Sequence, residues 1–160
     1  MTKGATVDMT GSMRTLDEQQ AAERVEQLIA EAVAALPARP KLTPLAANTT
    51  RCDDPTDLGP KGRIQVARSY WLDDLPADQD RAGYFDALHD YWTSHGYTVL
   101  EDGRGRTVQD RETGEVRPAP MLWVERDEDA FRLNLYGSAG GDISLGANSP
   151  CVWPNGVPTS

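Results

Sequence analysis

The chain has 160 residues with 25 acidic and 16 basic side chains, so its formal net charge at pH 7 is −9. This length suits one domain that buries its own core without a metal, and the acidic balance disfavours nucleic-acid phosphates and anionic membranes as partners. The composition, with 39% hydrophobic residues, is that of a globular protein, and no apolar run approaches the roughly 20 residues of a bilayer-spanning helix.

Residues 1–14 offer few side chains that a core could bury. Residues 1–13 also lack the apolar segment that an export signal contains. We expect this stretch to be a flexible linker or a remnant of cloning.

The first predicted element is an amphipathic helix over residues 15–36. Thr15 and Glu18 have the spacing of a capping box, in which a hydroxyl and a carboxylate bind free backbone N–H groups. Apolar residues recur at intervals of three and four and form one stripe, made of Ala21, Ala22, Val25, Leu28, Ile29, Ala32, Val33 and Leu36. Pro37 ends the helix. We expect the stripe to cover a sheet of the same domain.

Residues 37–62 are rich in proline, glycine, asparagine and aspartate, and a long loop is predicted there. Because loops of this length are uncommon unless they are functional or pinned, a covalent bond from Cys52 would serve to hold it. Asp53, Asp54 and Asp57 could offer oxygen ligands to a calcium ion. Their spacing is not that of an EF-hand loop, so a solvated acidic turn is the simpler interpretation.

The remaining chain predicts one more helix and several strands. Alternating apolar residues indicate a strand over residues 63–72, and aromatic residues at helical spacing indicate a helix over residues 79–95 that Gly96 ends. A strand over residues 97–101 would complete a β-α-β unit around that helix. Further short strands are predicted at residues 107–110, after the turn at residues 112–115, and at residues 121–126, 130–136 and 142–145.

Together these elements predict a single α+β domain over residues 15–155. Two helices would pack on one face of a mostly antiparallel sheet of four to five strands, with the β-α-β unit around the second helix. The tail beyond Trp153 is expected to fray, and residues 156–160 are placed outside the domain.

The chain has two cysteines, Cys52 and Cys151. Neither belongs to a C-x-x-C motif or has a histidine nearby, so a zinc site or a thiolate nucleophile is not indicated. A disulfide between them would enclose about 100 residues, which chain entropy values at roughly 4–5 kcal/mol. It would also indicate maturation in an oxidising compartment outside the cytosol. Two inert thiols are the alternative.

No catalytic constellation is evident in the sequence, and neither a cofactor nor a metal is predicted. His89 and His95 are the two histidines, and six positions on a helix turn them about 120° apart, so they cannot bind one metal together. No nucleophile or acid partner is indicated for either. The glycine-rich segment 137–141 matches neither the nucleophile-elbow motif nor the phosphate-binding loop.

Most of the 11 aromatic residues are expected in the core or at its rim. Trp71, Tyr136 and Trp153 are candidates for an interaction surface, because tryptophan and tyrosine dominate the hot spots of interfaces. Trp153 follows Cys151 closely, so packing over a disulfide is the simpler expectation for it.

Three segments resemble small secreted lipoproteins of actinobacteria. They are the helix from Leu16 to Pro37, the segment Arg51-Cys52-Asp53-Asp54-Pro55, and the segment Ser149-Pro150-Cys151-Val152-Trp153-Pro154. The resemblance implies an extracytoplasmic domain, secreted or anchored to the outer face of the cell membrane, whose two cysteines form a bridge. In such proteins a signal and a lipidated cysteine precede a linker like residues 1–13. Neither is present in this chain.

These observations favour a non-catalytic extracytoplasmic domain of a secreted or lipid-anchored bacterial protein, which binds a protein or a cell-envelope component. A monomer is expected, with no nucleic-acid partner and with membrane contact only through a lipid anchor that this chain lacks. The alternative is a small acidic cytosolic inhibitor or immunity-type protein that neutralises a basic partner. A small hydrolase that uses His89 or His95 is a third hypothesis.

Overall fold

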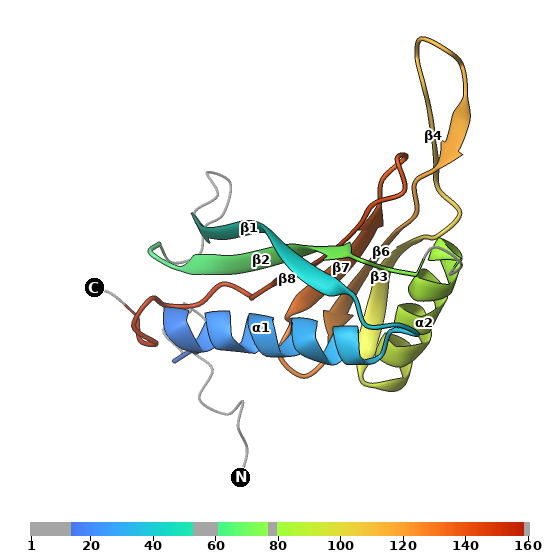
Figure 1. The fold of residues 1–160 in the computed structure, drawn as a ribbon. Coiled ribbons are helices and arrows are strands. Elements are labelled where there is room, and N and C mark those ends of the chain that lie inside the picture. The colour runs from blue at the N-terminus through green and yellow to red at the C-terminus, as the bar shows by residue number, and fades with distance from the viewer. Residues whose placement is uncertain (1–13, 53–60, 77–79, 159–160) are drawn as a thin grey trace.

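The computed structural model describes residues 14–52, 61–76 and 80–158. Within them the chain forms two helices, a six-stranded sheet and a separate two-stranded hairpin (Figure 1). The helices are α1 (Glu18–Ala34) and α2 (Arg81–Ser94). The strands are β1 (Lys41–Arg51), β2 (Ile64–Asp73), β3 (Tyr97–Gly103), β4 (Thr107–Gln109), β5 (Val116–Pro118), β6 (Met121–Arg126), β7 (Arg132–Gly137) and β8 (Ile143–Asn148).

The α+β class is confirmed, but the main sheet has six strands among the described residues rather than four or five. Its order is β1-β2-β8-β7-β6-β3, and every neighbouring pair is antiparallel. The strands that flank α2, β2 and β3, therefore run in the same direction but are separated by β8, β7 and β6. The expected β-α-β unit is thus a long crossover between strands that are not neighbours, because β8, β7 and β6 lie between β2 and β3 in the sheet.

The prediction of a loop over residues 37–62 is wrong for residues 41–51. These residues form β1, which pairs with β2 along its whole length. Pro44 and a register shift between Pro44 and Ala46 obscure the alternation of this strand. Both features are tolerated because β1 lies at the edge of the sheet, where a missing N–H or a bulge breaks no second ladder. Pairing with β2 forms the strand, whereas local pattern does not predict it.

The capping box of α1 is also displaced from the predicted position. Asp17, not Thr15, is the N-cap: its carboxylate accepts a hydrogen bond from Gln20 N at 2.7 Å, and the Gln20 side chain accepts one from Asp17 N at 3.0 Å. Asp17 and Thr15 are both residue types that are preferred at an N-cap, so the sequence alone does not distinguish them. Thr15 has a different partner in the tertiary structure, described below.

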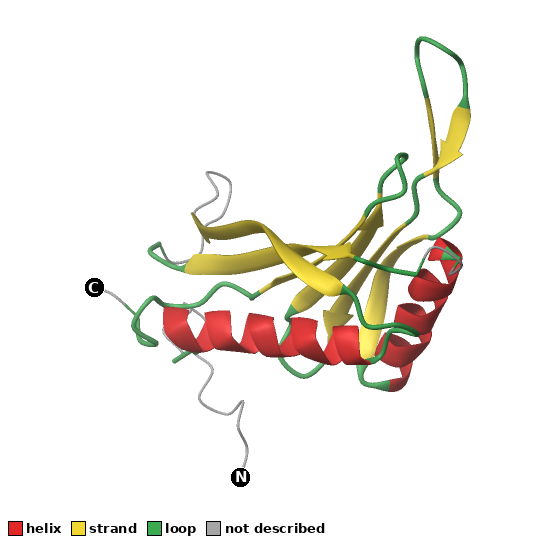
Figure 2. Cartoon of the chain, in the orientation of Figure 1, coloured by secondary structure: helices red, strands yellow, loops and turns green. Residues whose placement is uncertain are grey.

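Both helices pack on the same face of the sheet and share one hydrophobic core (Figure 2). From the helices this core takes Val25, Leu28, Ile29, Tyr84, Phe85, Leu88 and Trp92, all almost fully buried. From the sheet it takes Leu122, Val124, Leu133, Leu135, Leu145 and Ala147. The β4–β5 hairpin, which was predicted, projects beyond the body of the molecule (Figure 1). Neither described helix has the length and apolar character needed to cross a bilayer.

The segment after Trp153 is held against the start of α1, where fraying was expected. Glu18 N donates to Pro154 O and Thr15 N donates to Gly156 O, each at 3.0 Å. Gly156 is buried. The first contact satisfies one of the backbone N–H groups that the first turn of a helix leaves without a partner. Residues 159–160 and residues 1–13 lie outside the described part of the chain, as do Asp53, Asp54 and Asp57.

Candidate functional site

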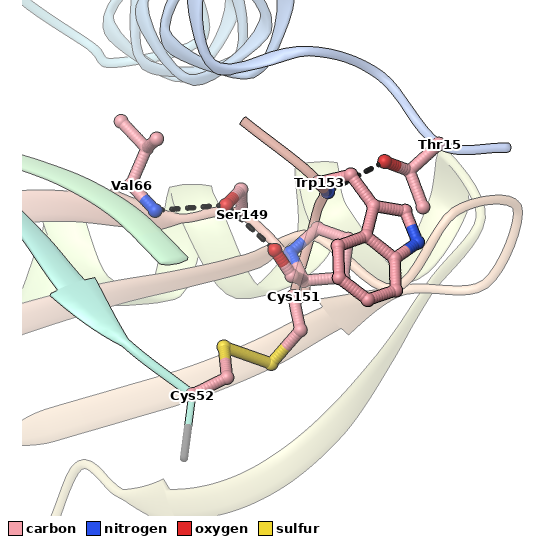
Figure 3. The surroundings of a disulfide bond; sticks show 7 residues. Thr15, Cys52, Val66, Ser149, Cys151 and Trp153 are labelled. Carbon is pink, nitrogen blue, oxygen red and sulfur yellow. Dashed lines mark hydrogen bonds between the residues drawn. A yellow bond between two sulfur atoms is a disulfide. The ribbon is translucent and has the colours of Figure 1, made fainter. Parts of the chain in front are cut away.

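Cys52 and Cys151 form a disulfide, as predicted (Figure 3). Their Cα atoms are 6.2 Å apart, and the bond joins the end of β1 to the segment that follows β8. The loop that Cys52 was expected to pin includes residues 53–60, which lie outside the described residues. The bond closes residues 52–151, most of the domain, into one covalent ring.

The residues around the disulfide are packed and internally hydrogen-bonded. Ser149 is 1% exposed, and its hydroxyl oxygen accepts from Val66 N at 2.9 Å while its proton is donated to Pro150 O at 2.7 Å. Trp153 N donates to Thr15 Oγ1 at 2.8 Å (Figure 3). Trp153 is itself 1% exposed. It belongs to the interior and does not form the surface suggested for it.

The other two candidates, Trp71 and Tyr136, lie together on the sheet face that is turned away from the helices. We call this face, between β1 and β3, the open face. The strand register places its residues in three rows that cross the sheet. In the first row Trp71 and Tyr136 stand on either side of Ser144. That row consists of Thr43, Trp71, Ser144, Tyr136 and Met121.

The second row contains an aromatic residue that was not singled out from the sequence, Trp123. Its indole N–H donates a hydrogen bond to the hydroxyl of Tyr136, and the two rings meet edge to face with centroids 6.0 Å apart. This contact links the first two rows. The second row consists of Ala46, Ser69, Gly146, Asn134, Trp123 and Glu101.

The third row carries two of the three charged side chains of these rows, and both lie on one side; Glu101 in the second row is the third. Arg132 and Glu125, on β7 and β6, form an ion pair with Nε and Oε1 2.9 Å apart. The part on β1, β2 and β8 is neutral. The third row consists of Asn48, Ala67, Asn148, Arg132, Glu125 and Thr98.

A hollow of about 210 Å³ lies in the open face, between the second and third rows. Gly146 contributes to it by having no side chain: a Cβ there would lie 3.0 Å from Asn134 Oδ1 and 3.3 Å from the Arg68 carbonyl oxygen. The hollow is lined by Ala46, Asn48, Ala67, Arg68, Ser69, Trp123, Asn134, Gly146 and Asn148. Its walls are thus an aromatic ring, small residues, neutral polar side chains and Arg68, whose guanidinium donates to the Ala67 carbonyl group and lies 3.9 Å from Glu26 on α1.

Two polar side chains of the open face are nearly buried yet have no protein partner. Asn134 and Ser144 are each 9% exposed, and neither side chain makes a hydrogen bond within the described residues. Their polar atoms remain within reach of water, because neither side chain is among the fully buried groups without a partner. Asn134 borders the hollow, so a ligand that entered it would meet an amide with two donor hydrogens and an acceptor oxygen.

A larger hollow, of about 700 Å³, lies beside the first turn of α2. Three of its charged groups are paired: Arg104 contacts Asp102 at 2.7 Å and Asp86 at 2.9 Å, while Asp80 accepts a hydrogen bond from Ala82 N at the start of α2. The hydrogen bond from Arg104 lowers the pKa of Asp102 to about 2. Arg81 donates to two backbone carbonyl groups. These side chains hold the base of the β4–β5 hairpin against α2, so their hydrogen bonds have a structural use.

The histidines lie on α2, and neither lines a hollow described above. His89 Nδ1 is 3.1 Å from Asp90 Oδ1, and His95 stacks on Tyr91 with ring centroids 4.2 Å apart. Ser94 Oγ is 3.0 Å from His95 Nδ1, but it also hydrogen-bonds the carbonyl groups of Asp90 and Tyr91, as serine commonly does within a helix. Among the described residues no group of three acidic, histidine or cysteine side chains is arranged to hold a metal.

Alternation along β6 and β7 is the signal that could have identified the missed residues. Trp123 stands between the buried Leu122 and Val124, and Asn134 stands between Leu133 and Leu135. Residues out of phase with the core must face the other side of the sheet.

Comparisons of the chain with protein-family models, curated proteins and solved structures find no match.

Proposed function

We propose that this chain is a non-catalytic binding domain that works outside the cytosol and holds a component of the bacterial cell envelope on its open face. The observation that carries this proposal is the open face itself. It gathers Trp71, Trp123 and Tyr136 with two unpaired polar side chains, and neither helix covers it.

The disulfide supports the location, because such bonds persist in oxidising compartments and are rare in the cytosol. It therefore favours the extracytoplasmic hypothesis over the cytosolic inhibitor. The resemblance of the two cysteine segments to actinobacterial lipoproteins supports an envelope component as the partner. The acidic chain would remain soluble beside such a surface, with its negative charge keeping copies apart.

Co-sedimentation tests this proposal. The oxidised domain is mixed with isolated envelope material from an actinobacterium, and the bound fraction is measured after centrifugation. We expect the wild-type domain in the pellet and Trp71→Ala largely in the supernatant. Tyr91→Ala is the matched control, because it removes a partly exposed aromatic ring from α2 on the other side of the molecule.

The proposal fails if the wild-type domain stays in the supernatant. It also fails if Trp71→Ala and Tyr91→Ala sediment equally, because the open face would then not be the binding surface. Circular dichroism of each variant shows that the fold is retained.

A further inference from the structure

We infer that the ligand of the open face is an uncharged carbohydrate chain, one ring of which enters the hollow beside Gly146. This inference rests on the proposed function and names the chemical class that the same face holds. Three independent features of the described residues point to it: the aromatic rings, the unpaired polar groups and the distribution of charge.

The aromatic rings provide one stacking surface in the hollow and another outside it, because Trp123 lines the hollow and Trp71 stands in the first row. Trp71 is on β2 and Trp123 is on β6, and three strand spacings of about 4.8 Å put their backbones about 14 Å apart across the sheet. An oligosaccharide can span this distance, whereas a single sugar cannot. The C–H groups on the face of a pyranose are weakly positive and suit the negative face of an aromatic ring. Both tryptophans are partly exposed, so a ligand can reach them.

The unpaired polar groups match the hydroxyls of a sugar. Asn134 and Ser144 lie low between large side chains, since Trp123 is beside Asn134 and Ser144 stands between Trp71 and Tyr136. A hydroxyl that projects from a sugar ring can reach such recessed groups and can both donate and accept hydrogen bonds.

Charge selects an uncharged ligand. The chain has a net charge of −9, yet the β1, β2 and β8 parts of all three rows carry no ionisable side chain. On the other half of the face, Arg132 and Glu125 neutralise each other, and the exposed Glu101 on the edge strand β3 is the remaining charged side chain of the three rows. Arg68 is the one ionisable residue that lines the hollow, and its guanidinium is engaged by Glu26 on α1 and by the Ala67 carbonyl group, so the hollow favours a ligand without charge.

The same residues argue against a protein partner. Serine and alanine are depleted at protein interfaces, and here Ser69, Ser144, Ala46 and Ala67 occupy the rows. The exposed large hydrophobic residues among those described lie outside the three rows. They are Leu45, Leu100, Val108, Val116 and Val157.

Titration with defined sugars tests the inference. The oxidised domain is titrated with cellotetraose, maltotetraose and mannotetraose, and binding is followed by calorimetry and by tryptophan fluorescence. We expect saturable binding of at least one of them, weakened about tenfold or more by Trp71→Ala. Tyr91→Ala should bind as the wild type does.

A second variant keeps the test informative if Trp71→Ala fails to fold. Gly146→Ala adds one methyl group that meets the Asn134 amide at 3.0 Å, so it narrows the hollow and leaves both tryptophans in place. It should weaken binding of the same sugar by a similar factor while the far-ultraviolet circular dichroism stays unchanged. Equal affinity of Gly146→Ala and wild type would overturn the placement of a ring in the hollow.

Treated envelope material separates failure of this inference from failure of the proposed function. If sedimentation depends on Trp71 and survives protease but not periodate, which cleaves the vicinal diols of sugars, the carbohydrate is supported.

If sedimentation is lost after protease treatment and no sugar binds, the partner is a protein and this inference is overturned, while the proposed function stands. If no sugar binds and Trp71→Ala turns a dimer into a monomer, a second copy covers the face and the inference is again overturned. If wild type neither sediments nor binds sugar, both proposals fall.

Discussion

The hydroxyl oxygen of Thr15 accepts a 2.8 Å hydrogen bond from the backbone N–H of Trp153, although 138 positions separate the two residues in the sequence. Together with the hydrogen bond from Thr15 N to Gly156 O, it joins the residues before α1 to the segment that follows the disulfide. The two ends of the described domain are therefore held beside each other by these hydrogen bonds, and the disulfide fixes the same C-terminal segment to the end of β1.

Thr15→Val tests that contact while keeping the shape of the side chain. The substitution leaves the Trp153 N–H without its acceptor in a partly buried position, so we expect a loss of about 1–3 kcal/mol in the free energy of unfolding. Urea denaturation measures it. The control is Thr49→Val, whose hydroxyl makes only a 3.4 Å contact with Glu18 on the exposed surface. Equal losses in the two variants would contradict the role given to Thr15.

Removing the disulfide should destabilise the fold through the unfolded state. The bond spans a sequence separation of 99, and replacing both cysteines by serine should lower the free energy of unfolding by about 4–5 kcal/mol. Reduction of the wild-type domain should give the same loss, and denatured, unreduced protein should contain no titratable thiol. A loss below about 1 kcal/mol would show that the covalent ring closed by the disulfide contributes little to the free energy of unfolding.

Alkaline pH should destabilise the domain through tyrosines whose pKa is raised. Burial, together with the hydrogen bond to Glu26, raises the pKa of Tyr70 to about 12, and burial raises that of Tyr97 to about 12. Both phenols ionise more readily in the unfolded chain, near pH 10. Their contribution to stability is therefore complete below about pH 10 and is lost as the pH rises toward about 12.

Urea midpoints measured across that range, together with the tyrosinate absorption band, check the prediction. Tyr70→Phe should flatten the alkaline decline, because it removes one of the three tyrosines whose pKa is raised, the others being Tyr91 and Tyr97. A decline of unchanged steepness in this variant would contradict the assignment to Tyr70.

Truncation of the core should cost far more than truncation of an exposed leucine. Leu135 is fully buried between the helices and the sheet, and Leu135→Ala should lower the free energy of unfolding by about 2–5 kcal/mol. Leu100 on the edge strand β3 is 46% exposed, so Leu100→Ala should change it by less than about 0.5 kcal/mol. Chemical denaturation of both variants makes the comparison, and similar losses would contradict the packing described here.

The elements that were predicted well are those whose pattern depends on one buried face. Helix α1 repeats its apolar residues at helical spacing from Ala21 to Val33, and all of the predicted positions in this range are buried except Ala22, which is partly buried. Strands β6 and β7 alternate in the same informative way. β8 was predicted to end at residue 145 but continues to Asn148, because Gly146 and Asn148 interrupt the apolar pattern while the backbone pairing on both sides persists.

The candidate site was predicted only in part. Trp71 and Tyr136 share the open face, but Trp153 is buried, because the segment after Cys151 folds back onto the start of α1. An aromatic residue carries no local sign of whether it lies inside or outside when its neighbours form no regular element. Trp123 and Asn134 could have been placed from alternation, but not next to Gly146, which belongs to another strand.

The sequence by itself determined the α+β class, both helices and the strands with clear alternation, because periodicity records which side of an element faces the core. It also offered a single possible pairing of its two cysteines. Tertiary structure alone decided that residues 41–51 form a strand, that Thr15 binds Trp153 rather than capping α1, and which side chains surround the hollow. These features depend on strand pairing and register between segments far apart in the chain, which no local pattern specifies.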